Sequence, residues 1–409
     1  MASKTPAKRL KISTFKLNAL LAITQAINEN LSINDLLKRY EAILREDLNI
    51  GKILIFKKND YWECILNSGY DIQHNRKIEV EQDLIEIEEI TFVTTSLNEA
   101  LGSFDIVIPV YKNNAPLAYI LIGDIDEEGE GVSPTIKHLH FVQTLSNIII
   151  VAIENIRLFN ESLRQEAIRK ELELASKMQS MLIPDKTALP RNDKVWITSF
   201  YHPHMDVGGD YYDVIQLNEN EVGFCIADVS GKGISAALLM SNFQANLRAL
   251  FNSSISLVEL VNILNERVMK SAKGEKFITL FIAKYNYETR NLEYINAGHN
   301  QPILYKTMSK EINYLSEGCV GMGMLDEIPL LKTGEVRITE RTKLLCYTDG
   351  LVELLEDEKV EMDTAEIEKC ITNAKNIEEN INQIIEEREI GDNNQVIFDD
   401  ITMLGIEFY

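Results

Sequence analysis

The chain has 409 residues, of which 45% are hydrophobic and 25% are charged, and its formal net charge is −22. The composition is typical of a globular protein, and the length exceeds what one hydrophobic core usually supports, so we expect two domains and a connector. The negative charge argues against nucleic acid or an anionic membrane as the main partner. The basic start, with Lys4, Lys8, Arg9 and Lys11, is interpreted as a flexible tail over residues 1–13.

Neither an export signal nor a membrane anchor is predicted. The longest strongly apolar run, Ile148–Ile153, is far shorter than the roughly 20 residues that cross a bilayer. No signal-peptide pattern follows Met1. The five cysteines are scattered without CxxC pairing, which favours reduced thiols over disulfides or a zinc site. These features predict a cytoplasmic protein.

Residues 14–158 show an α+β pattern. Apolar residues at helical spacing predict a helix from Phe15 and a second helix that begins after Ser32 and stops at Gly51. Two strand pairs are then predicted, at residues 52–56 with 61–66 and at residues 105–111 with 117–124. A closing helix begins near Ser133.

In length and order of elements, residues 14–158 resemble a GAF domain. The segment lacks the Asn-Lys-x-x-x-Phe-x-x-x-Asp-Glu signature of cyclic-nucleotide-binding GAF modules. The resemblance therefore leaves two alternatives, a sensor for an unknown small molecule and a ligand-free dimerisation module.

The closing helix carries a heptad seam, formed by Leu145, Ile149, Ala152, Ile156, Phe159 and Leu163. Beyond Leu163 the seam continues only with a four-residue stutter, which would locally unwind a coiled coil. Pro184 ends the helix. We favour a helical linker over residues 159–190 that pairs two chains in a parallel homodimer. The alternative is that the apolar stripe packs on its own domain.

Residues 191–409 become β-rich. Strands are predicted at residues 195–201, 212–217, 222–227, 277–285, 292–296, 302–305, 344–347, 395–398 and 402–408. Helices are predicted at residues 234–251, 256–272, 364–374 and 377–387. Helices interposed among antiparallel strands fit a sheet-on-sheet sandwich with helices on its outer faces.

Four short motifs in this region place aspartates where strands end. They are Gly208-Gly209-Asp210, Asp228-Val229-Ser230-Gly231-Lys232-Gly233, Thr348-Asp349-Gly350 and Asp399-Asp400-Ile401-Thr402. Converging carboxylates raise one another's pKa unless a cation neutralises them. Mg²⁺ and Mn²⁺ take both carboxylate and backbone carbonyl oxygens. A phosphate-binding loop at Gly231-Lys232-Gly233 is disfavoured, because its spacing is not that of a Walker A or GxGxxG motif.

Together, these motifs closely resemble the metal-dependent (PPM-type) serine/threonine protein phosphatases, specifically the bacterial SpoIIE-type class. The helical entry with Gln179, Leu182 and Pro184 and the stretch from Asn296 to Pro302 add to the resemblance, which covers residues 171–409. It implies an αββα sandwich and two divalent cations, Mn²⁺ or Mg²⁺.

The resemblance also implies a role for each aspartate. Asp228 would bridge the two cations, with the Val229 carbonyl as a further ligand, and Asp349 and Asp399 would bind directly. Asp210 would act partly through water, and Asp400 is the alternative to Asp399. Asp210, Asp228, Asp349 and Asp399 are the predicted catalytic set.

Three other polar positions have two interpretations each. His299 is either a proton donor to the leaving group or, as we favour, a structural histidine. A metal site at His202 and His204 has no third ligand and is disfavoured. Lys232 either steers a phosphate or is a solvated lysine.

The predicted function is metal-dependent protein serine/threonine phosphatase activity that uses activated water, regulated through the GAF-like domain and the linker. The resemblance implies a phosphoserine or phosphothreonine substrate on an anti-anti-sigma factor or a similar STAS-domain protein. The alternative is a catalytically idle signalling scaffold that binds cations and a partner without turnover.

Overall fold

The computed structural model describes residues 6–71, 78–93, 101–125, 134–352, 364–390 and 399–409. The chain forms two compact units, an N-terminal unit, Met1–Glu166, and a C-terminal unit, Ala167–Tyr409. The boundary between them falls inside the segment predicted as the linker.

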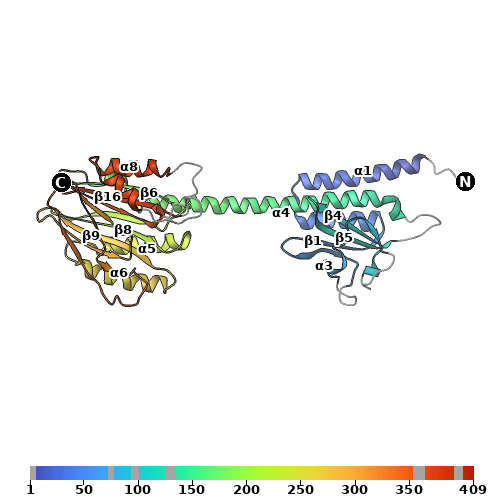
Figure 1. Ribbon diagram of the computed structural model, residues 1–409. Helices are drawn as coiled ribbons and strands as arrows, with labels where there is room; N and C mark the ends of the chain where they lie inside the picture. The colour runs from blue at the N-terminus through green and yellow to red at the C-terminus, as the bar shows by residue number, and fades with distance from the viewer. Residues whose placement is uncertain (1–5, 72–77, 94–100, 126–133, 353–363, 391–398) are drawn as a thin grey trace. The chain divides into compact units, whose positions relative to one another are not determined.

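The N-terminal unit is built on an antiparallel sheet with strand order β2-β1-β5-β4-β3 (Figure 1). The strands are β1 (Ile50–Lys58), β2 (Trp62–Ser68), β3 (Thr91–Phe92), β4 (Ile106–Lys112) and β5 (Ala115–Ile125). One face of the sheet packs on α1 (Pro6–Asn28), α2 (Ile33–Ala42) and the first part of α4 (Pro134–Ser180). A smaller apolar cluster covers the other face, beside the short helix α3 (Val80–Asp83). Residues alternate between these faces along β1, so the sheet has two hydrophobic sides.

Two boundaries in this unit were predicted wrongly. Residues 6–13 belong to α1 rather than to a flexible tail, because proline suits the first helical position and lysine and arginine are good helix formers. The second helix does begin at Ser32, whose side chain accepts the Asp35 N–H. It does not stop at Gly51, because a π-helical turn (Ile43–Asp47) follows it and Gly51 lies within β1.

The apolar seam of α4 divides into a buried part and an exposed part. Leu145, Ile149 and Ala152 are buried in the N-terminal core. Phe159 and Leu163 are 63% and 53% exposed. The first part of the seam therefore packs on its own domain, as the alternative interpretation held, and only the second part is available to a partner.

α4 also holds the one stretch, among the described residues, that is long and apolar enough to cross a membrane by length and composition. Half of that window is buried within the protein. This is weak support for a membrane span, because a core helix has the same composition.

A buried ion pair fixes α4 against the sheet. Lys57 Nζ of β1 lies 2.7 Å from Glu154 Oε2, and both side chains are more than nine-tenths buried. Arg157 donates two further hydrogen bonds to the same carboxylate. Arg157 and Lys57 together lower the pKa of Glu154 to about 2. A shift of α4 along β1 would bury an unpaired charge, so the pair sets the register of the helix.

The C-terminal unit is a sandwich of two sheets (Figure 1). One has the order β13-β10-β9-β8-β7, with β14 also paired to β10, and the other has the order β12-β11-β15-β16-β6. The first sheet contains β7 (Tyr211–Asn218), β8 (Glu221–Val229), β9 (Ile278–Asn286), β10 (Asn291–Ala297), β13 (Gly318–Cys319) and β14 (Gly334–Arg337). The second contains β6 (Val195–His202), β11 (Ile303–Lys306), β12 (Glu311–Tyr314), β15 (Thr342–Tyr347) and β16 (Ile401–Phe408).

Helices cover both outer faces of this sandwich. α5 (Ile234–Leu250) and α6 (Leu257–Ala272) pack on the first sheet, and α7 (Thr364–Ile371) and α8 (Ile377–Glu387) pack on the second. The main core lies between the sheets, where side chains such as Phe281 and Leu404 are fully buried. The predicted layer order is confirmed, whereas the strand predicted at residues 395–398 lies outside the described residues.

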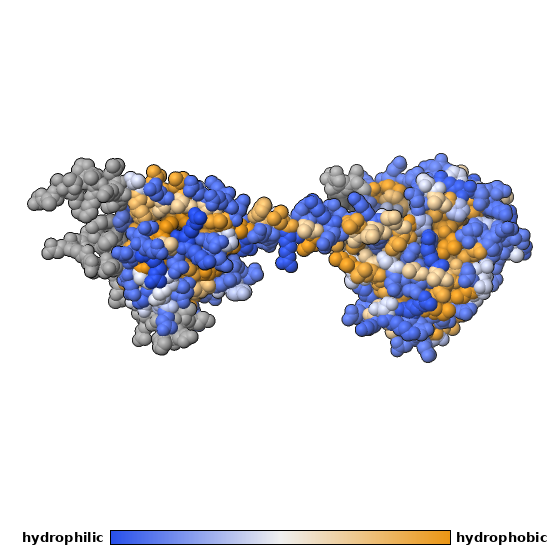
Figure 2. Space-filling view, turned by 180° about the vertical axis from the view of Figure 1, so that it is seen from behind, coloured by the Kyte–Doolittle hydropathy of each residue, from blue (hydrophilic) through white to orange (hydrophobic). Residues whose placement is uncertain are grey.

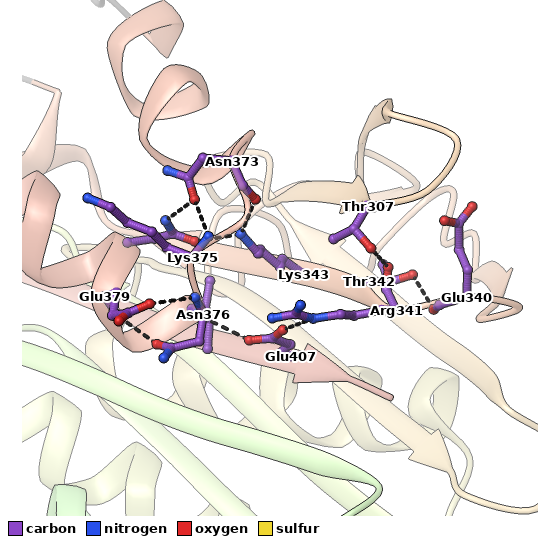
Figure 3. Close-up of polar contacts among 12 residues, drawn as sticks. Thr307, Glu340, Arg341, Thr342, Lys343, Asn373, Lys375, Asn376, Glu379 and Glu407 are labelled. Carbon is purple, nitrogen blue, oxygen red and sulfur yellow. Dashed lines mark hydrogen bonds and ion pairs between the residues drawn. The ribbon is translucent and has the colours of Figure 1, made fainter.

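A buried polar network ties α7 and α8 to the second sheet (Figure 3). Lys343 Nζ donates to the Ile371 carbonyl at 3.1 Å, the Asn373 carbonyl at 2.9 Å and Asn380 Oδ1 at 2.8 Å. The neighbouring Glu407 pairs with Arg341 and accepts the Ile377 N–H. Burial lowers the pKa of Lys343 to about 8, so the ammonium is charged at neutral pH and bonds the carbonyls where α7 ends.

Lys343→Met should lower the free energy of unfolding of the C-terminal unit by about 3 kcal/mol, because it leaves three buried acceptors without a donor. Urea unfolding followed by Trp196 fluorescence in a Trp62→Phe background reports on this unit. Lys306→Met is the control, since Lys306 pairs with the half-exposed Glu311 and its loss should cost less than about 1 kcal/mol. Equal losses in the two variants would show that the buried network has no special role.

Candidate metal centre

The predicted aspartates gather at one end of the sandwich. Asp210 immediately precedes β7, and Asp228 is the penultimate residue of the adjacent strand β8. Asp349 follows β15, and Asp399 and Asp400 precede β16, the strand paired with β15. Each sheet therefore contributes carboxylates from neighbouring strand ends.

Asp210 is held by two threonines of the opposite sheet. Its Oδ2 accepts hydrogen bonds from Thr348 Oγ1 at 2.8 Å and from Thr402 Oγ1 at 2.5 Å. The Thr402 N–H donates to Thr348 Oγ1 at 2.9 Å, so the two threonines also bond each other. Sequence reasoning missed both residues, although each stands inside an aspartate motif, one before Asp349 and the other two after Asp400.

The electrostatics of the cluster are those of crowded carboxylates. Burial, together with the charges of Asp349 and Asp399, raises the pKa of Asp228 to about 7. Burial and the charges of Asp228 and Asp400 raise the pKa of Asp210. The cluster therefore resists full ionisation at neutral pH unless a positive charge compensates it.

Asp400 fixes the loop between β6 and β7. Its Oδ1 accepts the His204 N–H at 2.8 Å and its Oδ2 accepts the Gly209 N–H at 2.6 Å. A Cβ at Gly208 would lie 2.6 Å from Asp400 Oδ2, and a Cβ at Gly350 would lie 2.1 Å from the Asp400 carbonyl oxygen. Both glycines are therefore required for close packing around Asp400.

The environment of Asp399 differs from that of Asp400. Its Oδ2 lies 2.9 Å from Lys232 Nζ, and its Oδ1 accepts the Asp400 N–H at 2.9 Å. The Val229 backbone is also at the cluster, because its carbonyl oxygen would be 3.0 Å from a Cβ at Gly209. Asp399 Oδ2 is therefore paired with a side-chain ammonium, whereas both side-chain oxygens of Asp400 accept backbone N–H groups.

The histidines lie in structural settings. His299 is buried, its ring Nδ1 is 2.9 Å from Thr279 Oγ1, and its backbone N–H donates to Asn296 Oδ1 at 2.8 Å. Burial lowers the pKa of His299 to about 4, so the ring is neutral at neutral pH. The His202 ring stacks on Phe200, and His204 contributes its backbone N–H to Asp400.

Gln179, in the last turn of α4, forms two hydrogen bonds with the loop that carries Asp210. Its Nε2 donates to the Gly208 carbonyl at 2.7 Å, and its Oε1 accepts the Gly208 N–H at 3.1 Å. The Gln179 side chain is buried. The sequence singled out Gln179 within a motif, but the contact with Gly208 joins positions 29 residues apart.

The donor set fits hard divalent cations. Carboxylate and carbonyl oxygens are the ligands that Mg²⁺ and Mn²⁺ prefer, and burial and neighbouring carboxylates raise the pKa values of Asp210 and Asp228. Among the described residues, no group of three or more His, Cys, Asp or Glu side chains is already arranged so that it could hold a metal ion. Lys232 and the two threonine hydroxyls are the observed partners of Asp399 and Asp210.

Comparison with known proteins shows that this unit is similar to bacterial phosphatases. Residues 218–409 match the protein-family model "Stage II sporulation protein E (SpoIIE)", a range that begins after Asp210. Over 189 residues the chain is 27% identical to phosphoserine phosphatase RsbP and 28% identical to phosphoserine phosphatase RsbU, both of Bacillus subtilis. These matches cover 45% and 46% of this chain and 46% and 55% of the relatives, so the chain spans about half the length of the curated relatives it matches.

The fold comparison agrees. The SiaA-PP2C domain of Pseudomonas aeruginosa superimposes with a TM-score of 0.51 at 18% identity, over 60% of this chain and 99% of that domain. The C-terminal unit therefore has a PP2C-like fold, and its residues 218–409 are similar to the SpoIIE family.

Proposed function

We propose that this chain is a metal-dependent protein serine/threonine phosphatase that works at the carboxylate cluster of the C-terminal unit. The observation that carries the proposal is the convergence of Asp210, Asp228, Asp349 and Asp399 at strand ends, with raised pKa values at Asp210 and Asp228. The similarity to phosphoserine phosphatases supports it.

We take the ligand set from the family resemblance and adjust it by the contacts of Asp210 and Asp400. Asp228, Asp349, Asp399 and the Val229 carbonyl would hold two divalent cations, Mn²⁺ or Mg²⁺. Asp210 would contribute less directly, because two threonine hydroxyls already bond its Oδ2. We assign Asp400 to loop positioning, because backbone N–H groups bond both of its oxygens. When bound, such cations lower the pKa of water and neutralise phosphoryl oxygens.

The protein's own residues organise this chemistry. Thr348 and Thr402 fix the orientation of Asp210, and Asp400 fixes the Gly209 backbone beside it. The neutral, buried His299 has no imidazolium proton to give to the leaving serine oxygen, so its role is to support the loop. Proton delivery to the leaving group therefore falls to water.

Phosphate release from a phosphoserine protein in the presence of Mn²⁺ tests this function. The proposal predicts that phosphate release requires Mn²⁺ or Mg²⁺. It also predicts that the protein hydrolyses a generic phosphoester under the same conditions. The alternative, an idle scaffold, predicts cation binding without phosphate release. Turnover that is absent despite measured Mn²⁺ binding would favour the scaffold.

The substrate that we propose is a phosphoserine or phosphothreonine on an anti-anti-sigma factor or a similar STAS-domain protein. The resemblance of the phosphatase domain to the SpoIIE-type class motivates this choice. An acidic enzyme, with a net charge of −22, would recognise such a partner by shape rather than by attraction to a large basic surface.

We further propose that the N-terminal unit is a GAF-like module that regulates the phosphatase through α4. The first part of α4 packs on the N-terminal sheet, where the Lys57–Glu154 pair fixes its register, and Gln179 in its last turn bonds the loop of Asp210. A displacement at the end of α4 would therefore move a backbone segment adjacent to a carboxylate of the cluster.

The exposed part of α4 supports a homodimer. Figure 2 shows hydrophobic residues interspersed with hydrophilic ones along the exposed stretch of the helix. Exposed apolar side chains continue to its end with Leu174 and Met178. Met178 lines an apolar groove of about 820 Å³, whose other wall is α5, with Ile234 and Leu238. A second copy of α4 would cover these side chains.

Leu163→Glu should convert a dimer into a monomer, because it places a charge in the exposed seam where the partner helix would pack. Light scattering at micromolar concentration should give twice the 46.6 kDa of one chain for the wild type and the single mass for the variant. Gln165→Glu adds the same charge on the opposite side of the helix and should remain dimeric. A wild-type monomer would contradict the proposed pairing.

A further inference from the structure

Lys232 lies against a carboxylate that we propose as a cation ligand. Its Nζ is 2.9 Å from Asp399 Oδ2, and 39% of the lysine side chain is exposed. Because the Asp400 N–H bonds the other oxygen of Asp399, both oxygens of this carboxylate have a partner within the chain. A solvated surface lysine would have no such fixed position.

Hydrogen bonds fix the loop that carries Lys232. Ser230 is joined to Phe277 by two hydrogen bonds of 2.9 Å, one from the Ser230 N–H to the Phe277 carbonyl and one from the Phe277 N–H to Ser230 Oγ. Lys276 Nζ donates to the Ser230 carbonyl at 2.7 Å. The glycines on either side of Lys232 have φ of +80° and +77°, a backbone conformation that favours glycine.

We infer that Lys232 is a tethered counter-ion of the carboxylate cluster and competes with the divalent cation for Asp399. This inference rests on the proposed metal centre. An ammonium beside Asp399 offsets part of the repulsion within the cluster. A divalent cation bound to the same carboxylate would lie next to the ammonium and be repelled by it. Cation binding at Asp399 therefore requires Lys232 to leave its present position.

The consequence is a cation affinity lower than the carboxylates alone would give. Removal of the Lys232 charge should tighten cation binding and, at the same time, make the chelator-treated protein less stable. These two effects have opposite signs. A lysine that merely supported the loop would weaken both properties when replaced.

Calorimetric titration of the full chain with Mn²⁺, after treatment with a chelator, tests the inference. The Kd for Mn²⁺ should fall roughly three- to ten-fold in Lys232→Met and in Lys232→Gln, and it should be unchanged in Lys232→Arg. The melting temperature in chelator should fall in the two neutral variants. Lys306→Met removes the same charge from the pair with Glu311 and should leave Mn²⁺ binding unchanged.

Unchanged or weaker Mn²⁺ binding in both neutral Lys232 variants would overturn the inference. Asp228→Asn separates this failure from failure of the metal centre. If the wild type binds no Mn²⁺, or if Asp228→Asn binds it equally well, the proposed metal centre itself is wrong. If Asp228→Asn abolishes binding and the Lys232 variants match the wild type, only the competition is wrong.

Discussion

Asp228→Asn should lower phosphate release by about 1000-fold or more while the protein remains folded. Asp228 lies at the centre of the cluster, because the charges of Asp349 and Asp399 both raise its pKa. An amide keeps the shape of the side chain but removes the charge with which Asp228 would hold the cations. Phosphate release from a phosphoserine protein at saturating Mn²⁺ measures the loss, and Asp349→Asn should behave in the same way.

The same substitution should stabilise the chelator-treated protein. The folded-state pKa of Asp228 is raised from 3.8 to about 7, so the wild type loses stability as the pH rises through this interval. The amide that replaces the carboxylate does not ionise, so the variant escapes that loss. The melting temperature of Asp228→Asn should therefore exceed that of the wild type at pH 8, and the difference should shrink at pH 5. Retained turnover with added Mn²⁺ would contradict the binuclear centre.

Gln179→Met should lower phosphate release by about 10-fold to 100-fold at limiting Mn²⁺, and raised Mn²⁺ should recover much of the loss. Methionine has a similar length but can replace neither bond to Gly208, which leaves a buried N–H and a buried carbonyl without a partner. The loop that carries Asp210 then loses its link to α4. Initial rates measured over a range of Mn²⁺ concentrations separate a positioning effect from a general loss of stability.

Gln244→Met provides the matched control for Gln179. Gln244 is also a buried glutamine of the C-terminal unit, and its side chain donates a long hydrogen bond, 3.5 Å, to the Leu182 carbonyl, which does not belong to the Asp210 loop. This variant should show the wild-type dependence on Mn²⁺. If Gln179→Met reduces the rate equally at every Mn²⁺ concentration, the link from α4 to the carboxylates is not as we propose.

Local patterns predicted much of the C-terminal unit. An apolar strand that ends in an aspartate is visible within a few residues, so Asp210, Asp228 and Asp349 could be placed at strand ends from the sequence. Strand pairing then determines that β7 lies beside β8 and β15 beside β16, which brings these ends together. Their roles as ligands stay predictions until a cation is measured at the site.

The contacts that position the carboxylates could not be predicted locally. Thr348 and Asp210 are 138 residues apart, and Thr402 and Asp210 are 192 residues apart. Such bonds depend on how the two sheets face each other, which no short window encodes. The heptad seam shows the same limit. Leu145 is buried in the core of its own unit and Leu163 is exposed, yet both stand at the same three- and four-residue spacing, so the spacing alone does not distinguish them.

Phosphate release by the wild-type chain, measured first in excess chelator and then with added Mn²⁺, tests the central claim most directly. We expect no release from a phosphoserine protein in chelator, recovery with Mn²⁺ or Mg²⁺, and no recovery in Asp228→Asn. Release that continues in chelator, or that Asp228→Asn recovers with Mn²⁺ as the wild type does, would show that the carboxylate cluster is not the catalytic centre.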